Sequence, residues 1–303
     1  MSPDHSSPRN IDPEDIPYFF DNWCSLSWSP WVQFTATKEE FRQIPKEPGL
    51  YRIRPVNRHF LMYIGETSRT VHQRLGELRQ TLRRSDLMPW NDPHTAAPSL
   101  WAWQNAEGYE YECSAAPLDA SANGRKGMEC FLLYKYRQER SESTLCNFGR
   151  FHPRYRKSTN RREGLRGGKL RDDQKDNPGG GPSIVPLEVK GKPGDRNWME
   201  LGWPDGKPLV SENTRRVTTG SGLYLLEDSV SKEIVYIGQS ASVMKRLLDH
   251  SRKTWNSRSL QFTFHVFGKP VLPHNLKELE NDLIGNYFEN FRKSPEYQFK
   301  NST

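Results

Sequence analysis

The chain has 303 residues, and 44 lysines and arginines against 37 aspartates and glutamates give it a formal net charge of +7. Hydrophobic residues make up 34% of the sequence, and no stretch approaches the roughly 20 consecutive apolar residues that a membrane-spanning helix needs. The composition therefore excludes a membrane-embedded protein, and the length predicts two domains. The excess of positive charge favours a polyanionic partner such as nucleic acid.

Two features of the composition bear on the cellular compartment. Residues 1–18 are polar and rich in proline, without the apolar core of a signal peptide, and we expect them to form a disordered tail. The four cysteines form no C-x-x-C pair, which argues against a zinc ribbon and a disulfide scaffold. Reduced thiols fit a cytoplasmic protein.

The first half of the chain predicts a small mixed unit. Residues 50–54 and 60–64 are β-rich runs around a turn-prone Pro-Val-Asn sequence, which is typical of a hairpin. Apolar residues at helical spacing predict a helix over 70–84. The alternating run 109–113 predicts a strand, and a second amphipathic pattern predicts a helix around 128–136.

The second half repeats this order. The runs 223–226 and 234–237 predict another hairpin, followed by a helix that contains Arg246, a strand at 262–267 and a helix over 276–287. Each half therefore reads β-β-α-β-α, and the expected fold class is α+β, with helices packed against a short sheet.

Sequence identities support an internal duplication. The segments at 22–28 and 197–203 both read N-W-x-x-L-x-W, and later segments, 49–65 and 222–238, both begin with GLY and end with YIG. An ordered set of such matches predicts two copies of one domain. The expected domains are residues 19–155 and 196–303.

Residues 156–195 between the copies are predicted to be a linker, because they combine basic, glycine and proline residues with little apolar content. A basic run from Arg150 to Arg171 enters its first half. This run either follows a nucleic-acid backbone through phosphate contacts or serves only as a solvated tether. The candidate nucleic-acid-binding residues are Arg69, Arg154, Arg156, Lys157, Arg161, Arg162, Arg166 and Lys169.

A hairpin that joins GLY to YIG, followed in order by a helical arginine, a glutamate in a later helix and an asparagine, resembles the GIY-YIG nuclease superfamily. The resemblance covers both halves and omits the tail and the linker. It implies hydrolysis of DNA phosphodiester bonds with a single divalent ion, Mg²⁺ or Mn²⁺, in each site. The implied catalytic residues are Tyr51, Tyr63, Arg74, Glu129 and Asn147 in the first copy, and Tyr224, Tyr236, Arg246, His250 and Glu280 in the second.

The chemistry explains why these residue types are needed. An arginine such as Arg74 meets the anionic phosphate with its planar guanidinium. The carboxylates of Glu129 and Glu280 suit Mg²⁺, which keeps several waters and accepts a single protein carboxylate. By resemblance, a hairpin tyrosine orients or activates the attacking water, and Asn147 supports the site through its amide.

The two copies depart from the family pattern in different ways. Some family members carry a histidine four residues after the arginine; the first copy has Leu78 there, which leaves His72 and His94 as candidates. The second copy has His250 at this position, but Gln298 replaces the asparagine, and its extra methylene could misplace the supporting amide. Whether the second site is active therefore stays open.

The leading hypothesis is a DNA endonuclease that acts in restriction or another defence against foreign DNA. A structure-specific repair or recombination nuclease is the alternative, as is a DNA-binding protein with a vestigial second nuclease unit. The expected partner is double-stranded DNA. Two copies in one chain suit cleavage of both strands, by a monomer acting as a pseudo-dimer whose linker lets one copy rotate against the other, or by a homodimer.

Overall fold

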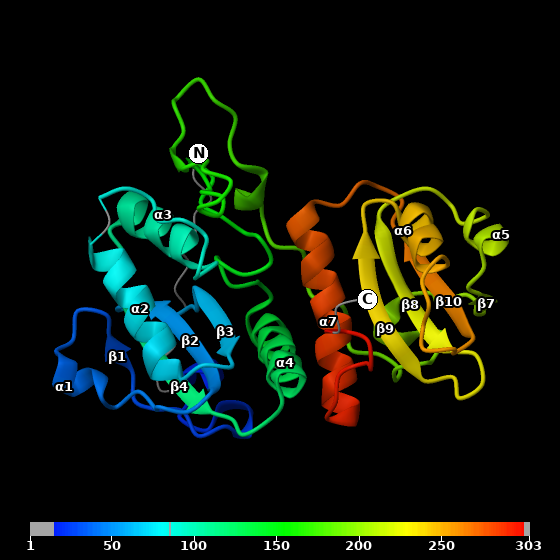
Figure 1. The fold of residues 1–303 in the computed structure, drawn as a ribbon, viewed down its shortest axis with the longest axis horizontal. Coiled ribbons are helices and arrows are strands. Elements are labelled where there is room, and N and C mark those ends of the chain that lie inside the picture. The colour runs from blue at the N-terminus through cyan, green and yellow to red at the C-terminus, as the bar shows by residue number, and fades with distance from the viewer. Residues whose placement is uncertain (1–14, 85, 300–303) are drawn as a thin grey trace.

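The computed structural model describes residues 15–84 and 86–299. It has a mixed α+β architecture with two four-stranded sheets and one two-stranded sheet, all antiparallel (Figure 1). No helix in the described ranges is long and apolar enough to cross a membrane. The α+β class predicted from the sequence is confirmed.

The first sheet has the order β1-β4-β2-β3. Its strands are β1 (Val32–Gln33), β4 (Tyr111–Pro117), β2 (Gly49–Pro55) and β3 (Tyr63–Thr67). The helices of this half are η2 (Pro17–Phe19), η3 (Trp23–Ser25), α1 (Lys38–Phe41), α2 (Val71–Arg84), α3 (Ala97–Glu107) and α4 (Ala122–Arg140). Alternation along β2 gives the sheet two buried faces. Tyr51 and Ile53 belong to the core formed with α2, whereas Leu50 belongs to the core formed with α4.

The second sheet repeats this arrangement in the order β7-β10-β8-β9. Its strands are β7 (Lys207–Pro208), β10 (Leu260–Val266), β8 (Gly222–Asp228) and β9 (Ile234–Ser240). The helices of this half are η5 (Trp198–Glu200), α5 (Ser211–Thr214), α6 (Val243–His250) and α7 (Pro273–Phe291). Tyr224 lies in the core with α6, whereas Leu223 lies in the core with α7, so the second sheet is also buried on both faces.

The two N-W-x-x-L-x-W segments form the same turn. In each, the second indole nitrogen donates to the backbone oxygen of the first tryptophan: Trp28 to Trp23 at 3.0 Å and Trp203 to Trp198 at 3.0 Å. The residue after the first tryptophan has a positive φ in both copies, 56° at Cys24 and 55° at Met199. The sequence repeat therefore corresponds to a repeat of local structure.

The observed elements of the first half differ from the expected ones at several places, which include the unpredicted β1 and α1. β3 begins at Tyr63 and not at residue 60, and β4 covers Tyr111–Pro117 in place of 109–113. The sequence prediction missed α3, whose residues from Ala97 to Trp103 are all buried. A helix buried on all sides has no apolar stripe, so its periodicity gives no signal.

The prediction of a disordered tail over residues 1–18 was wrong for its last residues. Residues 1–14 of it lie outside the described residues, but Ile16 and Tyr18 are buried in the first core. The buried Arg52 donates to the backbone oxygen of Tyr18 at 2.6 Å. These contacts attach residues 16–18 to the first sheet.

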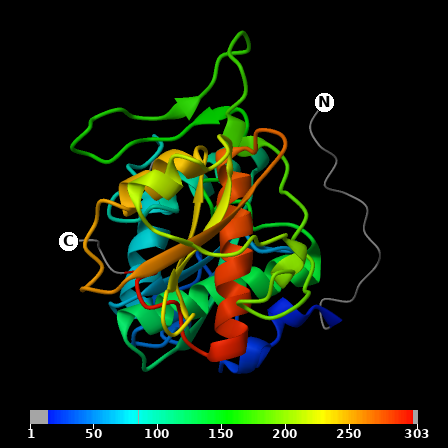
Figure 2. The same cartoon turned by 90° about the vertical axis from the view of Figure 1, so that its right-hand side faces the viewer.

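Parts of the expected flexible linker, residues 156–195, are ordered and contact the two halves, although most of residues 161–181 are exposed. β5 (Tyr155–Arg156) pairs with β6 (Gly168–Lys169) in a segment that projects from the molecule (Figure 2), and η4 (Pro178–Gly180) follows it. Further on, the backbone N–H groups of Ile184 and Leu187 donate to buried carboxylates on α7. This part of the segment is ordered in spite of its low apolar content, because its backbone forms these hydrogen bonds with α7.

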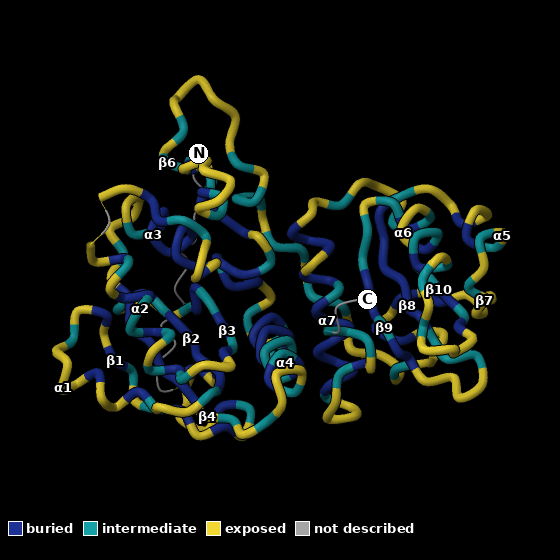
Figure 3. Tube along the Cα trace, in the orientation of Figure 1, coloured by how far each residue is buried: buried dark blue, intermediate teal, exposed yellow. Residues whose placement is uncertain are grey.

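The helices α4 and α7 pack against each other between the two sheets (Figure 1). Buried residues run along both of them (Figure 3). Phe131 and Tyr134 of α4 share a hydrophobic cluster with Leu283 and Phe288 of α7. The two halves are therefore joined through a common core. This packing is at odds with the expectation that the linker lets one copy rotate against the other.

Candidate active sites

Two stacked tyrosines form the centre of the first candidate site. Tyr51 on β2 and Tyr63 on β3 have ring centroids 5.9 Å apart. Gly65 lies directly beneath them: a Cβ there would fall 2.7 Å from the Tyr51 Oη and 2.6 Å from the Tyr63 Cε1. A real Cβ does not approach so closely, so the rings can occupy these positions only over a glycine.

Arg74, near the start of α2, lies beside these rings. Its Nη1 donates to the Pro93 backbone oxygen at 2.8 Å. Burial raises the pKa of Tyr51 to about 12, although the Arg74 charge and its hydrogen bond to the phenol oppose the rise. The Tyr51 phenol is therefore neutral at physiological pH and acts as a hydrogen-bonding group.

The structure selects between the two histidines left open by the sequence. The ring centroid of His94 lies 6.2 Å from that of Tyr51 and 6.4 Å from that of Tyr63. His72 instead packs against Phe41, with centroids 5.2 Å apart. His94 is 4% exposed, and neither of its ring nitrogens has a hydrogen-bond partner among the described residues.

His94 is held neutral in this environment. Burial lowers its pKa well below the ordinary value, and the positive charges of Arg74 and Arg69 lower it further. A neutral imidazole has one nitrogen that accepts a hydrogen bond and one that donates. His94 therefore places two buried ring nitrogens without a hydrogen-bond partner among the described residues beside the phenols.

Glu129 on α4 supplies a carboxylate to this site. Burial raises its pKa to about 8, the neighbouring Glu66 raises it as well, and Lys126 opposes both. Its negative charge also raises the pKa values of Tyr51 and Tyr63 after the larger effect of burial. A divalent cation would relieve the repulsion between the two carboxylates.

Glu66 is a site residue that the sequence analysis missed. It follows the YIG motif directly on β3, and that position was the available signal. Its Oε2 lies 3.5 Å from the Arg125 Nε. Among the described residues, no three His, Cys, Asp or Glu side chains cluster as a metal site; a Mg²⁺ that keeps its waters needs only one or two carboxylates, so Glu129 and Glu66 fit it.

Asn147 clamps the edge strand β3. Its Oδ1 accepts from the Ile64 N–H at 3.0 Å, and its Nδ2 donates to the Ile64 oxygen at 2.8 Å. The Thr144 hydroxyl donates to the same Oδ1 at 2.7 Å. Because Ile64 lies between the YIG tyrosine and glycine, this amide fixes the strand that carries them.

The second candidate site has the same central arrangement. The rings of Tyr224 and Tyr236 have centroids 6.1 Å apart, and a Cβ at Gly238 would fall 2.8 Å from the Tyr236 Cε1. The Tyr224 Oη and the His250 Nε2 lie 2.9 Å apart. A hydrogen bond with Tyr224 raises the pKa of Arg246, which places the guanidinium at the phenol.

The ionisable groups of the second site are shifted as in the first. Burial lowers the pKa of His250 to about 3, and Arg246 and Lys253 lower it as well. Burial raises the pKa of Glu280 to about 7, opposed by a hydrogen bond from the Gln239 backbone and by the charge of Lys277. Both copies thus combine a neutral histidine with a carboxyl that protonates unusually easily.

Gln298 supports the second site in the way that Asn147 supports the first. Its Oε1 accepts from the Ile237 N–H at 3.0 Å, and its Nε2 donates to the Ile237 oxygen at 3.0 Å. The misplacement considered from the sequence does not occur. The amide binds Ile237, which lies at the strand position equivalent to Ile64.

The basic segment divides into exposed and engaged residues. Arg154 forms an ion pair with Asp176 at 2.7 Å, and Arg166 stacks 4.5 Å from the Trp90 ring. Burial lowers the pKa of Lys157, and Arg69 pairs with Glu77 at 2.8 Å. The expected phosphate-binding residues that are exposed and form neither an ion pair nor a cation–π contact within the described ranges are Arg156, Arg161, Arg162 and Lys169.

The basic segment also contacts the loop that carries His94. The Arg161 N–H donates to the Asp92 Oδ1 at 2.7 Å, and the Asn91 N–H donates to the Thr159 oxygen at 3.1 Å.

Searches of family models, curated proteins and solved structures found no match to the chain.

Proposed function

We propose that the chain is a metal-dependent DNA endonuclease of the GIY-YIG type, acting in restriction or another defence against foreign DNA. One observation carries the proposal: the same constellation occurs twice. In each half, two tyrosines stack over a glycine, an arginine of the next helix and a histidine lie beside them, and a glutamate of the last helix completes the group.

The residues of the first site suit phosphodiester hydrolysis. Arg74 presents a fixed charge to the scissile phosphate, which lowers the cost of the charge that develops during attack. The neutral Tyr51 phenol accepts a hydrogen bond from a water and orients it. A Mg²⁺ held by Glu129 and Glu66 would add Lewis acidity and neutralise the phosphate.

A tyrosine–histidine pair can orient the attacking water. In the second site the Tyr224 Oη and His250 Nε2 are already 2.9 Å apart, and burial keeps the imidazole neutral by lowering its pKa. A neutral imidazole can hold the phenol in a hydrogen bond and so orient the phenol oxygen toward a bound water. His94 contacts the rings of the first site from a different element and is proposed to do the same.

One observation favours a weaker second unit. The position after YIG is Glu66 in the first copy and Gln239 in the second, so the second site lacks the additional carboxylate. A carboxamide is a poorer ligand for Mg²⁺ than a carboxylate. A DNA-binding protein with a vestigial second nuclease unit is therefore the second candidate function.

A plasmid assay tests the proposal. The full chain should nick supercoiled DNA with Mg²⁺ or Mn²⁺ and not with a chelator. Glu129→Gln should reduce cleavage by the first site by at least about 100-fold, since it removes the carboxylate charge but keeps the shape. Glu280→Gln measures the second site in the same way, and the exposed Glu212→Gln on α5 is the matched control. Unchanged cleavage by the Glu129→Gln, Glu280→Gln double variant would reject both sites.

A further inference from the structure

The helices α4 and α7 are counterparts in the two copies, and equivalent residues of the two helices are 151 positions apart in the sequence. Cys130 and Asn281 are 151 residues apart, and the Asn281 Nδ2 donates to the Cys130 backbone oxygen at 3.1 Å. Glu129 and Glu280 precede these two residues and occupy equivalent positions in the repeat. Residues that are each other's counterparts touch where they lie near the axis that relates the two copies, and exchanged contacts around that axis make it a two-fold.

A second pair of counterparts lies on the same axis. A Cβ added to Gly285 would overlap the Tyr134 Cβ and lie 2.7 Å from its Cγ. Tyr134 and Gly285 also correspond in the repeat. Two self-paired contacts one helical turn apart, Cys130 with Asn281 and Tyr134 with Gly285, define the axis through the α4–α7 interface.

Contacts away from the axis occur in exchanged pairs. Arg137 of α4 binds Asp282 of α7, with Nε and Oδ1 2.7 Å apart. The pair related by the repeat is Phe288 of α7 with Phe131 of α4, whose ring centroids lie 5.8 Å apart. The interface is thus symmetric in position, with an ion pair on one side of the axis and an aromatic pair on the other.

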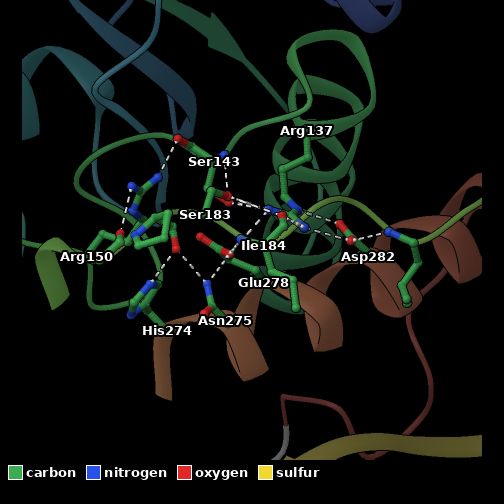
Figure 4. Close-up of polar contacts among 12 residues, drawn as sticks. Arg137, Ser143, Arg150, Ser183, Ile184, His274, Asn275, Glu278 and Asp282 are labelled. Atoms are coloured by element: carbon green, nitrogen blue, oxygen red, sulfur yellow. Dashed lines mark hydrogen bonds and ion pairs between the residues drawn. The ribbon is translucent and has the colours of Figure 1, made fainter. Parts of the chain in front are cut away.

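The ionic side fixes the arrangement (Figure 4). Arg137, Glu278 and Asp282 are all 0% exposed, and the Arg137 Nη2 also donates to the Asp282 Oδ2 at 3.0 Å. The Glu278 Oε2 accepts from the Ile184 N–H at 2.9 Å. Separating the helices would leave buried charges unpaired, so the network opposes any rotation of one half against the other.

Both candidate sites lie at the same end of this axis. Glu129 and Glu280 each directly precede one member of the self-paired contact between Cys130 and Asn281. Since Cys130 is part of the self-paired contact, the two sites flank the axis at equivalent positions.

We propose that the α4–α7 interface is a fixed pseudo-two-fold joint that presents the two sites to the two strands of one DNA duplex. The strands of a duplex are antiparallel and related by local two-fold axes, and one of these would coincide with the axis between Cys130 and Asn281. This inference rests on the proposed nuclease function. It implies that a single chain cuts both strands with a constant stagger, without movement between its halves.

The interface can be disturbed without touching either site. In Gly285→Ala, the new Cβ forces Tyr134 and α7 apart. We expect the rate of first-strand nicking to stay within about threefold of wild type, and linear plasmid to form at least about tenfold more slowly, because the second site is displaced from its strand. Gly76→Ala on α2, whose added Cβ has its nearest neighbour at 3.8 Å, is the matched control and should behave as wild type.

Wild-type protein provides a second test that does not depend on folding of the variant. The rate at which linear product forms should be first order in enzyme concentration. With plasmid at saturation, an excess of the Glu129→Gln, Glu280→Gln double variant should not change this rate. Sequencing of the product ends should give one stagger. Second-order kinetics, inhibition by the double variant or variable staggers would overturn the joint while leaving nicking intact. A chain that nicks with neither metal would instead reject the nuclease function itself.

Discussion

At the scale of single residues, glycine sets the geometry of both sites. Gly65 and Gly238 lie beneath stacked tyrosines at distances that leave no room for a Cβ. The register of the hairpins places each glycine opposite a buried tyrosine, Tyr51 with Gly65 and Tyr224 with Gly238. The YIG glycine is therefore required for packing of the site itself and not for a turn.

Gly65→Ala should inactivate the first site. The added methyl would displace the Tyr51 hydroxyl, and an error of about 1 Å in a catalytic group costs on the order of 100-fold in rate. The change is best measured in a Glu280→Gln background, where only the first site cuts plasmid. Gly168→Ala, whose Cβ has no neighbour within 4 Å, is the control; equal loss in both variants would contradict the packing role.

The raised carboxyl pKa values predict a pH dependence of stability. Free glutamate has a pKa of 4.5, and burial raises that of Glu129 to about 8 and that of Glu280 to about 7. Between these values the folded chain binds more protons than the unfolded one, so the free energy of unfolding falls as pH rises. Metal-free protein should therefore lose thermal stability from about pH 5 to about pH 8.

Metal and substitution should both reverse this loss. Mg²⁺ binds the deprotonated carboxylates, so it should raise the melting temperature more at about pH 8 than at about pH 6. The Glu129→Gln, Glu280→Gln variant should show a flatter pH profile and no Mg²⁺ effect. A wild-type profile that matches this variant at every pH would show that neither carboxyl titrates in this range.

At the scale of secondary structure, the sequence predicted those strands and helices that have a regular apolar periodicity or a recognisable turn. The two hairpins and the helices α2, α4 and α7 followed from alternation and from apolar residues at helical spacing. α3 did not, because Leu100, Trp101 and their neighbours are buried all round. The ordering of the linker was missed for another reason: its partners, such as Glu278, are distant in sequence.

The projecting basic segment should contribute phosphate contacts. Replacing the exposed Arg156, Arg161, Arg162 and Lys169 with glutamine should weaken binding to any duplex sequence. The slope of log affinity against log salt should fall by about 0.9 for each phosphate that the segment no longer neutralises. Glutamine at the exposed Lys192, Lys207, Arg215 and Lys269 removes the same charge elsewhere. Equal slopes for the two variants would leave the segment without a role in binding.

At the scale of the whole molecule, the motifs identified most of each site but not how the sites are joined. Glu66 escaped the motif comparison, because it occurs in one copy alone. His94 was a candidate beside His72, and only its place next to the two tyrosine rings distinguishes it. The sequence analysis considered only the longer side chain of Gln298, whereas the position of its amide beside Ile237 determines whether it supports the strand. The contact between the halves depends on pairs such as Arg137 with Asp282, which no local pattern reveals.

The pairing of Tyr134 with Gly285 on the pseudo-two-fold axis also determines which units can associate. Two first units placed about this axis would set one tyrosine against another, and two second units would set glycine against glycine and leave a void. Overpacking and cavities are both destabilising. The tyrosine side chain of the first unit fits the space left by the glycine of the second unit. Each unit therefore associates with the other kind in preference to its own. Exchange of halves between neighbouring chains would still satisfy this rule, but a like-with-like pair would not.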